Sequence, residues 1–366
     1  MTPVHDIQNE GATKEKIIVT IAVVGPLLGF LFALYLCWNK YVFTSDLILL
    51  AVMYVATSLG VTIGFHRMLT HKGFQAPHWL RKTFLVLGCM AVPGIGPQYW
   101  AATHIRHHAH SDEEGDPHSP LEGLWHAHIG WMYDRAGNSN VQTYGKHFLE
   151  DEDVMFVSRT GLVWAVLSFA IPFSLGGWTG LLWGGVVRFF FGTHVMWSVN
   201  SICHTFGERD FETTDESRNH WLIGMLALGE GWHNNHHAFP ESAMHGLRWW
   251  QFDFSAYVIN ILERVGLVWD VKRVSPEILY ATKDKWVVMQ QSLNQMRLDV
   301  LAELAKARAE LAKRYGWQAV YRWRPKVQEA RRLKQIQRIV KRESRMKRQT
   351  LSAYLQEIKG LVPAAA

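Results

Sequence analysis

The stretch Gly231-Trp232-His233-Asn234-Asn235-His236-His237 places three histidines within five positions. The same HxxHH spacing occurs at His104, His107 and His108. Residues i, i+3 and i+4 of a helix lie on one face, so each set presents three ring nitrogens toward one volume. This spacing is typical of metal ligands, and the rest of the chain can be read as a scaffold for them.

The chain of 366 residues contains apolar runs long enough to cross a membrane. One helical crossing needs about 20 apolar residues. The runs predict four spans at about residues 17–38, 46–65, 160–176 and 178–200. We therefore expect an all-α integral membrane protein with four transmembrane helices in two hairpins. The first run is too long for the core of a cleaved signal peptide, so it is expected to stay in the membrane.

Charge is distributed unevenly along the chain, whose net charge is +6. Residues 283–348 hold 19 Lys or Arg and 6 Asp or Glu, so the remainder of the chain is net acidic. The positive-inside rule predicts that this basic tail, residues 276–366, marks the cytoplasmic face. A polar lead-in is expected at residues 1–16 and the membrane domain at 17–275. The three cysteines form no CxxC pattern, which excludes an iron–sulfur or disulfide framework.

The tail has helical periodicity. Apolar residues at Leu293, Met296, Val300 and Leu304 recur at 3–4 spacing among basic residues. Three interpretations remain open: a solvated amphipathic helix, a lipid-surface anchor, or a docking platform for an acidic electron donor.

Three further histidines follow predicted spans: His66 and His71 after the second, and His204 after the fourth. On an ideal helix, residues five apart differ by about 140°, so His66 and His71 can share one metal only if the helix ends or bends between them. If the histidines share one membrane face, residues 83–100 do not cross. Pro93 and Pro97 interrupt that segment, and we expect it to be interfacial or re-entrant.

Nine patterned imidazoles exceed the needs of one metal, because zinc takes four ligands and an octahedral site six. The sequence therefore predicts two metals. Imidazole suits Zn, Cu, Fe and Ni. A site that opens toward lipid-facing helices favours oxidation of a hydrocarbon, which requires a redox-active metal such as iron.

Several motifs together carry a family resemblance. They are Gly64-Phe65-His66-Arg67, Asp116-Pro117-His118-Ser119-Pro120, Gly130-Trp131, Asn200-Ser201, and Gly229-Glu230-Gly231-Trp232 leading into the second HxxHH set. In their order and spacing, these motifs resemble the membrane-bound fatty acyl desaturases of the stearoyl-CoA (Δ9) type. The resemblance covers roughly residues 17–269 and leaves the tail uncovered.

The resemblance implies a four-helix fold with a cytosolic helical cap that holds two irons above an acyl tunnel. The ligands implied for one iron are His66, His71, His104, His108 and His237. Those implied for the other are His107, His204, His233 and His236, with Asn200 reaching it through a water. Neighbouring candidates for orienting ligands or contacting substrate are Arg106, Asp116, His118, Trp131, Glu230 and Trp232. Asp112, Glu113, His110, His126 and His128 are further candidates, whereas His5, His78, His147, His194, His220 and His245 are expected to be structural or at the surface.

The chain departs from the family near the second histidine set. Ile105 follows His104, and Ala102-Thr103 stands where animal members have an Arg-Asp pair. The acyl carrier, CoA, lipid or carrier protein, therefore stays open. The chain has no fused haem domain with a His-Pro-Gly-Gly motif, which implies a separate donor such as ferredoxin, rubredoxin or a cytochrome b5-like protein.

The expected function is an O2-dependent desaturation that introduces a cis double bond into a saturated acyl chain, with membrane lipid around the protein and no nucleic-acid partner. An acyl or alkyl hydroxylase would share the same histidine plan. A membrane metal transporter is a third reading, although transporters place ionisable residues at mid-membrane. Product analysis separates the first two readings, and metal analysis separates the third.

Overall fold

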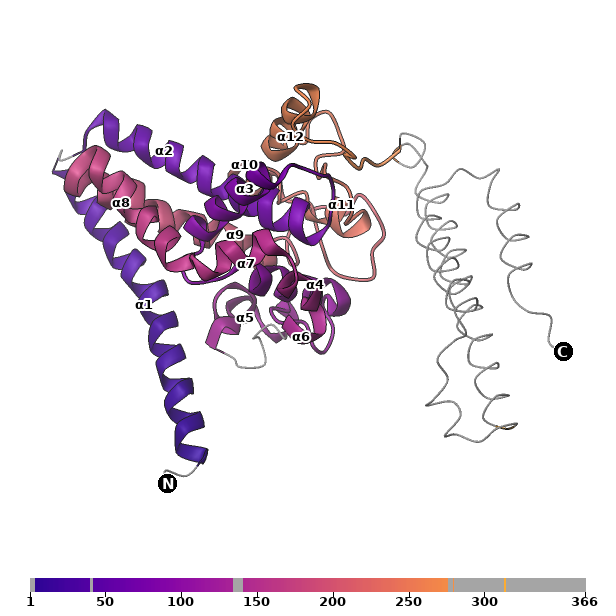
Figure 1. Ribbon diagram of the computed structural model, residues 1–366, viewed down its shortest axis with the longest axis horizontal. Coiled ribbons are helices and arrows are strands. Elements are labelled where there is room, and N and C mark those ends of the chain that lie inside the picture. The colour runs from indigo at the N-terminus through magenta and orange to yellow at the C-terminus, as the bar shows by residue number, and fades with distance from the viewer. Residues whose placement is uncertain (1–3, 40–41, 134–140, 276–278, 280–312, 314–366) are drawn as a thin grey trace. The chain divides into compact units, whose positions relative to one another are not determined.

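The structure, a computed structural model, describes residues 4–39, 42–133, 141–275, 279 and 313. The chain divides into two units, Met1–Arg273 and Val274–Ala366. The helix expected in the basic tail lies almost entirely outside the described residues. In the described part of the first unit, helices are joined by turns, and isolated bridges such as Gln75 to Trp269 replace strands. The all-α expectation is confirmed for this part of the chain (Figure 1).

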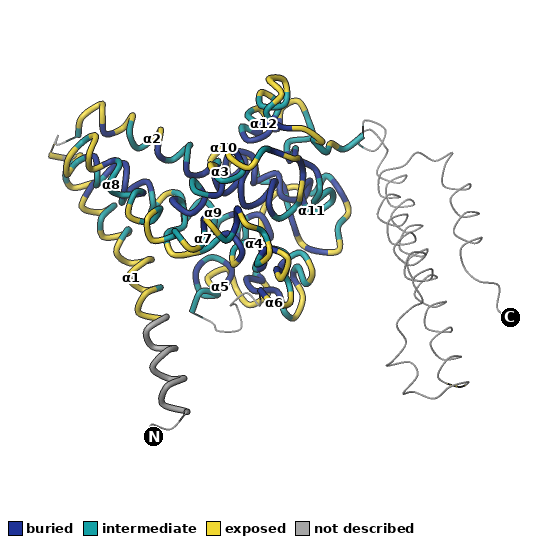
Figure 2. The backbone as a smooth tube through the Cα atoms, in the orientation of Figure 1, coloured by how far each residue is buried: buried dark blue, intermediate teal, exposed yellow. Residues whose placement is uncertain are grey.

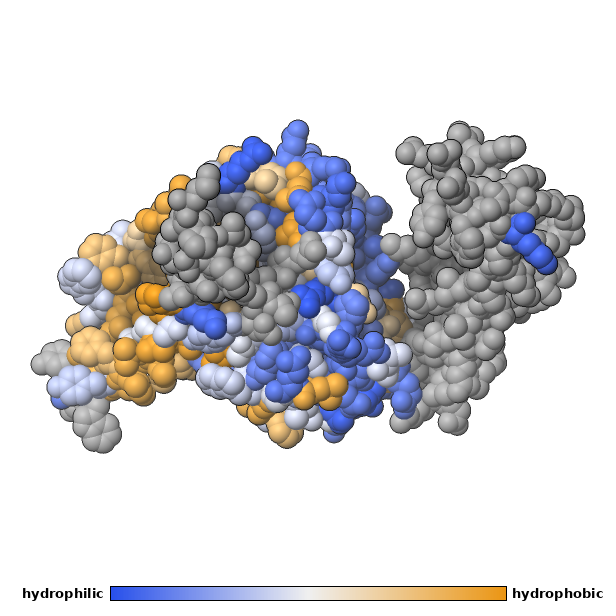
Figure 3. All heavy atoms as spheres, turned by 90° about the horizontal axis from the view of Figure 1, so that it is seen from below, coloured by the Kyte–Doolittle hydropathy of each residue, from blue (hydrophilic) through white to orange (hydrophobic). Residues whose placement is uncertain are grey.

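Three helical runs are long and apolar enough to cross a membrane. They are α1 (Val4–Trp38), the continuous pair α2 (Thr44–Leu59) and η1 (Gly60–Thr70), and the continuous series α8 (Gly161–Gly180), η6 (Leu181–Val187) and α9 (Arg188–Ser201). The helix α1 begins inside the stretch expected to be a lead-in. Hydrophobic side chains gather over the end of the molecule that holds these runs (Figure 3). The spans expected at 160–176 and 178–200 both fall in the third run.

The third run reverses direction at Gly177. Its φ of 59° lies in the left-handed region that favours glycine. Beyond this break, the Arg188 guanidinium donates to the Ser168 carbonyl at 3.2 Å, and the rings of Phe169 and Phe189 lie 6.2 Å apart. Contacts between residues so far apart in sequence require the two halves to pack antiparallel, as a helical hairpin.

The helix α3 (His78–Ala91) packs back against η1. A Cβ on Gly60 would fall 2.1 Å from the Gly88 nitrogen, so only glycine permits this backbone approach. Fourteen residues rise about 21 Å, short of the roughly 30 Å hydrocarbon core. The chain then turns into α4 (Pro97–His110). Residues 83–100 thus form the end of α3, a turn and the start of α4 rather than one long helix.

The segment η1 is a π-helix. The His71 N–H donates to the His66 carbonyl at 3.1 Å, which is an i to i+5 bond. Such a bond places residues five apart one above the other, whereas an α-helix would separate them around its axis. The wider turn, together with the end of the helix at Thr70, brings His66 and His71 to one face.

The remaining helices form the cap, defined as α4 and the elements that follow here. They are η2 (Pro120–Glu122), α5 (Leu124–His128), η3 (Gly130–Tyr133), α6 (Val141–Tyr144), η5 (Lys146–Leu149), α7 (Glu152–Arg159), α10 (Trp221–Leu226), α11 (His233–Ala238) and α12 (Phe254–Arg264). Buried backbone concentrates around α11, α4 and the ends of the apolar runs that meet them (Figure 2).

Candidate metal centre

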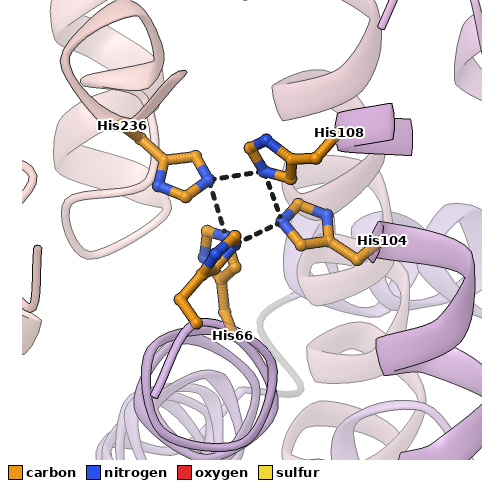
Figure 4. A group of neighbouring side chains, drawn as sticks. His66, His104, His108 and His236 are labelled. Carbon is orange, nitrogen blue, oxygen red and sulfur yellow. Dashed lines mark hydrogen bonds between the residues drawn. The ribbon is translucent and has the colours of Figure 1, made fainter. Parts of the chain in front are cut away.

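Five histidines from η1, its C-terminal end, α4 and α11 converge on one volume. The Nε2 atom of His104 lies 3.1 Å from Nε2 of His71 and 3.1 Å from Nε2 of His108. The Nε2 atom of His236 lies 2.9 Å from that of His108 and 3.1 Å from that of His66. Four of these rings turn toward one another in Figure 4. We call these five residues the first group; their ligand atoms all lie within 4.8 Å of one another.

Four other histidines make a second group of the same kind: His107, His204, His233 and His237. The Nε2 atom of His233 lies 3.0 Å from that of His204 and 3.1 Å from that of His237. The two groups are adjacent, because the His108 and His237 rings stack with centroids 4.5 Å apart. All nine histidines predicted from the spacing therefore meet in one place.

The two HxxHH sets divide between the groups by one rule. In α4, His104 and His108 point into the first group, and His107 points into the second. In α11, His233 and His237 point into the second group, and His236 points into the first. Residues i and i+4 are about 40° apart around a helix, whereas i+3 and i+4 are about 100° apart. The i and i+4 members therefore stay together.

The division implied by the family resemblance is wrong at two positions. It paired His237 with His66 and placed His236 beside His233. The structure places His236 with His66 and His237 with His233. The short helix α11 offers two diverging faces, and its orientation, not the motif, decides which group each face meets.

The spacing of the nitrogens fits a metal ion. Two imidazole nitrogens bound at right angles, each about 2.1 Å from one metal, lie about 3.0 Å apart. The neighbouring Nε2 pairs in both groups are separated by 2.9–3.1 Å. The Nε2 atom of His107 is buried and has no hydrogen-bond partner among the described residues. A cation in each group would satisfy these facing lone pairs.

Carboxylates hold the opposite ring nitrogens. The Nδ1 atoms of three second-group rings meet carboxylate oxygens: His107 with Asp116 at 3.0 Å, His204 with Asp112 at 2.8 Å and His237 with Asp215 at 2.6 Å. In the first group, Nδ1 of His66 contacts Glu230. A carboxylate accepts the Nδ1 proton and leaves Nε2 free to bind a metal.

The electrostatics keep most of these rings neutral. Burial, aided by neighbouring histidines, holds the pKa of seven of the nine well below the ordinary value of 6.5. They are His71, His104, His107, His108, His233, His236 and His237. A neutral imidazole is the form that binds metal, so these rings can bind a metal cation without first losing a proton from a charged form.

A buried ion network supports the first group. The Arg67 guanidinium is fully buried; it donates to Glu230 at 3.0 Å and to Asp253 at 3.0 Å. Its partner Glu230 also contacts His66, and His245 lies 3.4 Å from the same carboxylate. His245, which was expected to be a structural or surface residue, is fully buried beside His66 and His236, in agreement with the first of these alternatives.

A cavity of about 530 Å³, counted with the open space at its mouth, lies against both groups. Its wall includes His66 and His104 of the first group and His233 of the second. Asn200, expected to reach a metal through water, also lines it. The rest of the lining is mostly apolar and comes mainly from α2, η1 and α9, with Trp100 of α4, Ala227 and Glu230 completing it. The site can therefore present two metals to an apolar ligand.

Residues 42–270 match the family model described as "Fatty acid desaturase". The chain belongs to this family. It is accordingly a membrane-bound desaturase, an oxidoreductase of lipid metabolism.

Three relatives show the range of the family around this desaturase. An sn-1 stearoyl-lipid 9-desaturase of Anabaena variabilis is 37% identical over 71% of this chain and 96% of its own. A hex-5-enoyl-[acyl-carrier protein] acetylenase of Moorena producens is 37% identical over 70% of this chain and 86% of its own. An acyl-CoA C20 Delta5-desaturase of Anemone leveillei is 42% identical over 58% and 69%. Their names differ in carrier and in the position of the reaction.

The other predicted residues of this desaturase occupy different places. Asp116 and Glu230 contact ring nitrogens, as expected of orienting residues. His118 is buried against His107, with ring centroids 4.4 Å apart, and Trp131 packs on His118. Arg106 donates to the Gly115 carbonyl at 2.7 Å.

Trp131 and Trp232, two of the residues expected to orient ligands or contact substrate, are not among the residues that line this cavity. Trp232 is buried and donates to the Phe252 carbonyl at 2.7 Å. Trp100, which the sequence did not single out, lines the cavity and stacks on His104 at 5.2 Å. Asp215 was also missed, because no motif surrounds it.

Proposed function

We propose that this desaturase uses O2 and two external electrons to introduce a cis double bond, at Δ9, into a saturated acyl chain carried on CoA or lipid. For each double bond, two hydrogens leave neighbouring carbons and combine with O2, two electrons and two protons to give two waters. The runner-up functions are hydroxylation, which would use the same two histidine groups, and metal transport.

The observation that carries this proposal is the cavity that touches both histidine groups. Its apolar walls suit methylene groups, which a protein can recognise only by their shape. A chain lying in it would pass beside His66, His104 and His233. Holding an unactivated C–H bond in place is the protein's main contribution, because positioning alone can supply a large part of the rate.

Iron fits the donor set, and two irons would supply the O2-dependent oxidation of a C–H bond. We propose that the first group holds one iron and the second group the other, with Asn200 contacting the second through water. Asp112, Asp116, Asp215 and Glu230 hold the ring protons at Nδ1 and so keep the Nε2 lone pairs directed inward.

We further propose four membrane crossings in two hairpins. The third apolar run has 41 residues, which rise about 60 Å if straight, twice the hydrocarbon thickness. The reversal at Gly177 allows this run to cross twice. Residues 83–100 would be re-entrant. The histidines, the N-terminus and the basic tail would then all face the cytoplasm, where a separate electron donor could reach the cap.

The test is expression of the full chain in a host that lacks its own desaturase. Gas chromatography should detect cis-monounsaturated fatty acids, and mass spectrometry of derivatised products should locate the double bond at Δ9. Lipid, acyl-CoA and carrier-protein fractions, analysed separately, identify the carrier. An alcohol in place of an alkene would point to hydroxylation, and purified protein with two zinc ions and no O2 consumption would overturn the proposal.

A further inference from the structure

A second, smaller cavity adjoins the one beside the histidines. Its far side is formed by Ala91, Val92 and Arg188. Ser58, Gly192 and Met196 line both cavities. Three residues therefore form the boundary between the two cavities, and one of them, Gly192, has only a hydrogen atom as its side chain.

Distance along α9 orders these residues. Asn200 lies at the histidine end of the first cavity, Gly192 at the boundary and Arg188 at the far side of the second. At about 1.5 Å per residue, Gly192 lies roughly 12 Å and Arg188 roughly 18 Å from Asn200. The second cavity thus extends the first by about one helical turn, away from the metal centre.

Gly192 leaves an open passage between the two cavities. A Cβ built on Gly192 meets no other atom within 4 Å, so the space beside it is empty instead of being filled by a neighbour. Glycine in a helix interior costs about 1 kcal/mol relative to alanine. Packing against a neighbouring helix does not explain this glycine, but an occupant of the cavity does.

The far side of the second cavity is fixed. The buried Arg188 guanidinium donates to the Met90 carbonyl at 3.0 Å, to the Gly184 carbonyl at 3.3 Å and to the Ser168 hydroxyl at 2.5 Å. These bonds tie together the end of α3, α8 and the start of α9. A side chain held by three segments makes a wall that does not retreat when a longer chain enters.

We propose that Gly192 sets the acyl-chain length that this desaturase accepts, by letting the methyl end of the substrate pass into the second cavity as far as Arg188. This inference rests on the proposed function, since it takes the first cavity as the acyl site. Ser58 and Met196 form the remaining rim of the passage. The chain-length specificity therefore depends on the space available to the last carbons of the acyl chain, not on contacts with the acyl carrier.

Replacing Gly192 with Leu should close the passage. Each methylene that loses its buried place should lower kcat/KM by about fourfold, so long substrates suffer and short ones do not. Gly192→Ala should give a smaller shift in the same direction. Met196→Ala widens the rim but leaves the Arg188 wall in place, so it should not extend the products beyond the chain lengths of the unmodified protein.

A matched control is Gly25→Leu. Gly25 lies in α1, is exposed, and likewise has nothing within 4 Å of a built Cβ, but it lines neither cavity. The same change there should leave the product lengths as in the unmodified protein. A defect shared by both variants would therefore reflect insertion or folding.

Two readouts separate this inference from the proposed function. The first is the chain-length profile of unsaturated products in cells supplied with saturated fatty acids of 14, 16 and 18 carbons. The second is photo-crosslinking of the full chain in membranes by a saturated fatty acid of 18 carbons that bears a diazirine next to its methyl end. Peptide mapping should find adducts near Ala91 and Val92, and Gly192→Leu should lose them.

The outcomes are distinct. Adducts at the second cavity without any unsaturated product would sink the proposed function and leave the binding role of Gly192 standing. Adducts confined to the first cavity, or an unchanged length profile in Gly192→Leu, would overturn the inference.

Discussion

The two histidine groups are neighbours built from the same motifs, yet they are supported differently. Three rings of the second group rest on carboxylates, namely Asp112, Asp116 and Asp215. No Arg or Lys pairs with these three carboxylates among the ion pairs of the described residues. In the first group the supporting carboxylate is Glu230, and the buried Arg67, which Glu230 shares with Asp253, partly offsets its charge.

The two groups therefore offer a metal ion different electrostatic surroundings. Uncompensated carboxylates favour a more highly charged cation, and they raise the basicity of the imidazoles that they hold. The second group should therefore stabilise the oxidised metal better than the first. The first group depends more on a buried ion pair, so a change that breaks this pair should lower both its metal binding and the stability of the fold.

The largest effects are expected from ligands of opposite groups on the same helix. His236→Ala and His237→Ala should each abolish unsaturated product, and each should lower the metal content from two ions per chain to about one. The measurement is gas chromatography of lipids together with metal analysis of the purified protein. His78→Ala, at a highly exposed ring that contacts Asp153, is the control and should keep both metals. If the His236→Ala protein still bound two metal ions per chain, the assignment of the first group as a metal site would be contradicted.

Arg67→Met should mainly affect stability. It leaves Glu230 and Asp253 buried without their cation, a change that typically costs about 3–5 kcal/mol. Thermal unfolding in detergent should reveal a marked drop, with loss of metal from the first group before the second. Arg273→Met offers the comparison, because its pair with Glu263 is exposed and should contribute at most about 1 kcal/mol. Equal melting temperatures for the two variants would contradict the asymmetry.

Asp215→Asn should weaken only the second group. The amide can no longer take the Nδ1 proton of His237 as a carboxylate does, and loss of such a partner costs about 10- to 100-fold in metal affinity. Titration with a chelator should then remove one metal early and the other at the usual concentration. Asp151→Asn, at a carboxylate paired with Arg81 away from the histidines, should leave the titration unchanged. Simultaneous loss of both metals would show that the groups are coupled.

Asn235→Ala should affect both groups alike and least strongly. Its amide donates to the His245 carbonyl and to Gln251, each at 2.8 Å, and accepts from Asn219 at 2.8 Å. These bonds fix α11, which serves both groups, and losing them should cost about 1–3 kcal/mol. A chelator titration should therefore shift in one step. Two separated steps would mean that α11 is not the shared anchor.

The sequence predicted the parts of this centre that repeat along the chain. The apolar runs and the spacing of nine histidines are local patterns, and the structure places those histidines together. Two kinds of feature escaped. Asp215, the partner of His237, lies in a segment that no motif marks, and the pairing of Arg67 with Glu230 joins two segments that no periodicity links. The division of His236 and His237 depends on the orientation of one six-residue helix, which long-range contacts set.

The π-helical winding of η1 limits how the sequence can vary here. Because His66 and His71 share a face only under i to i+5 bonding, the number of residues between them and the local winding must change together. Deleting one intervening residue would give a pair that suits an ordinary α-helix, but it would also rotate all of α2 against its neighbours. The interval between these two histidines is thus as firmly constrained as the histidines themselves.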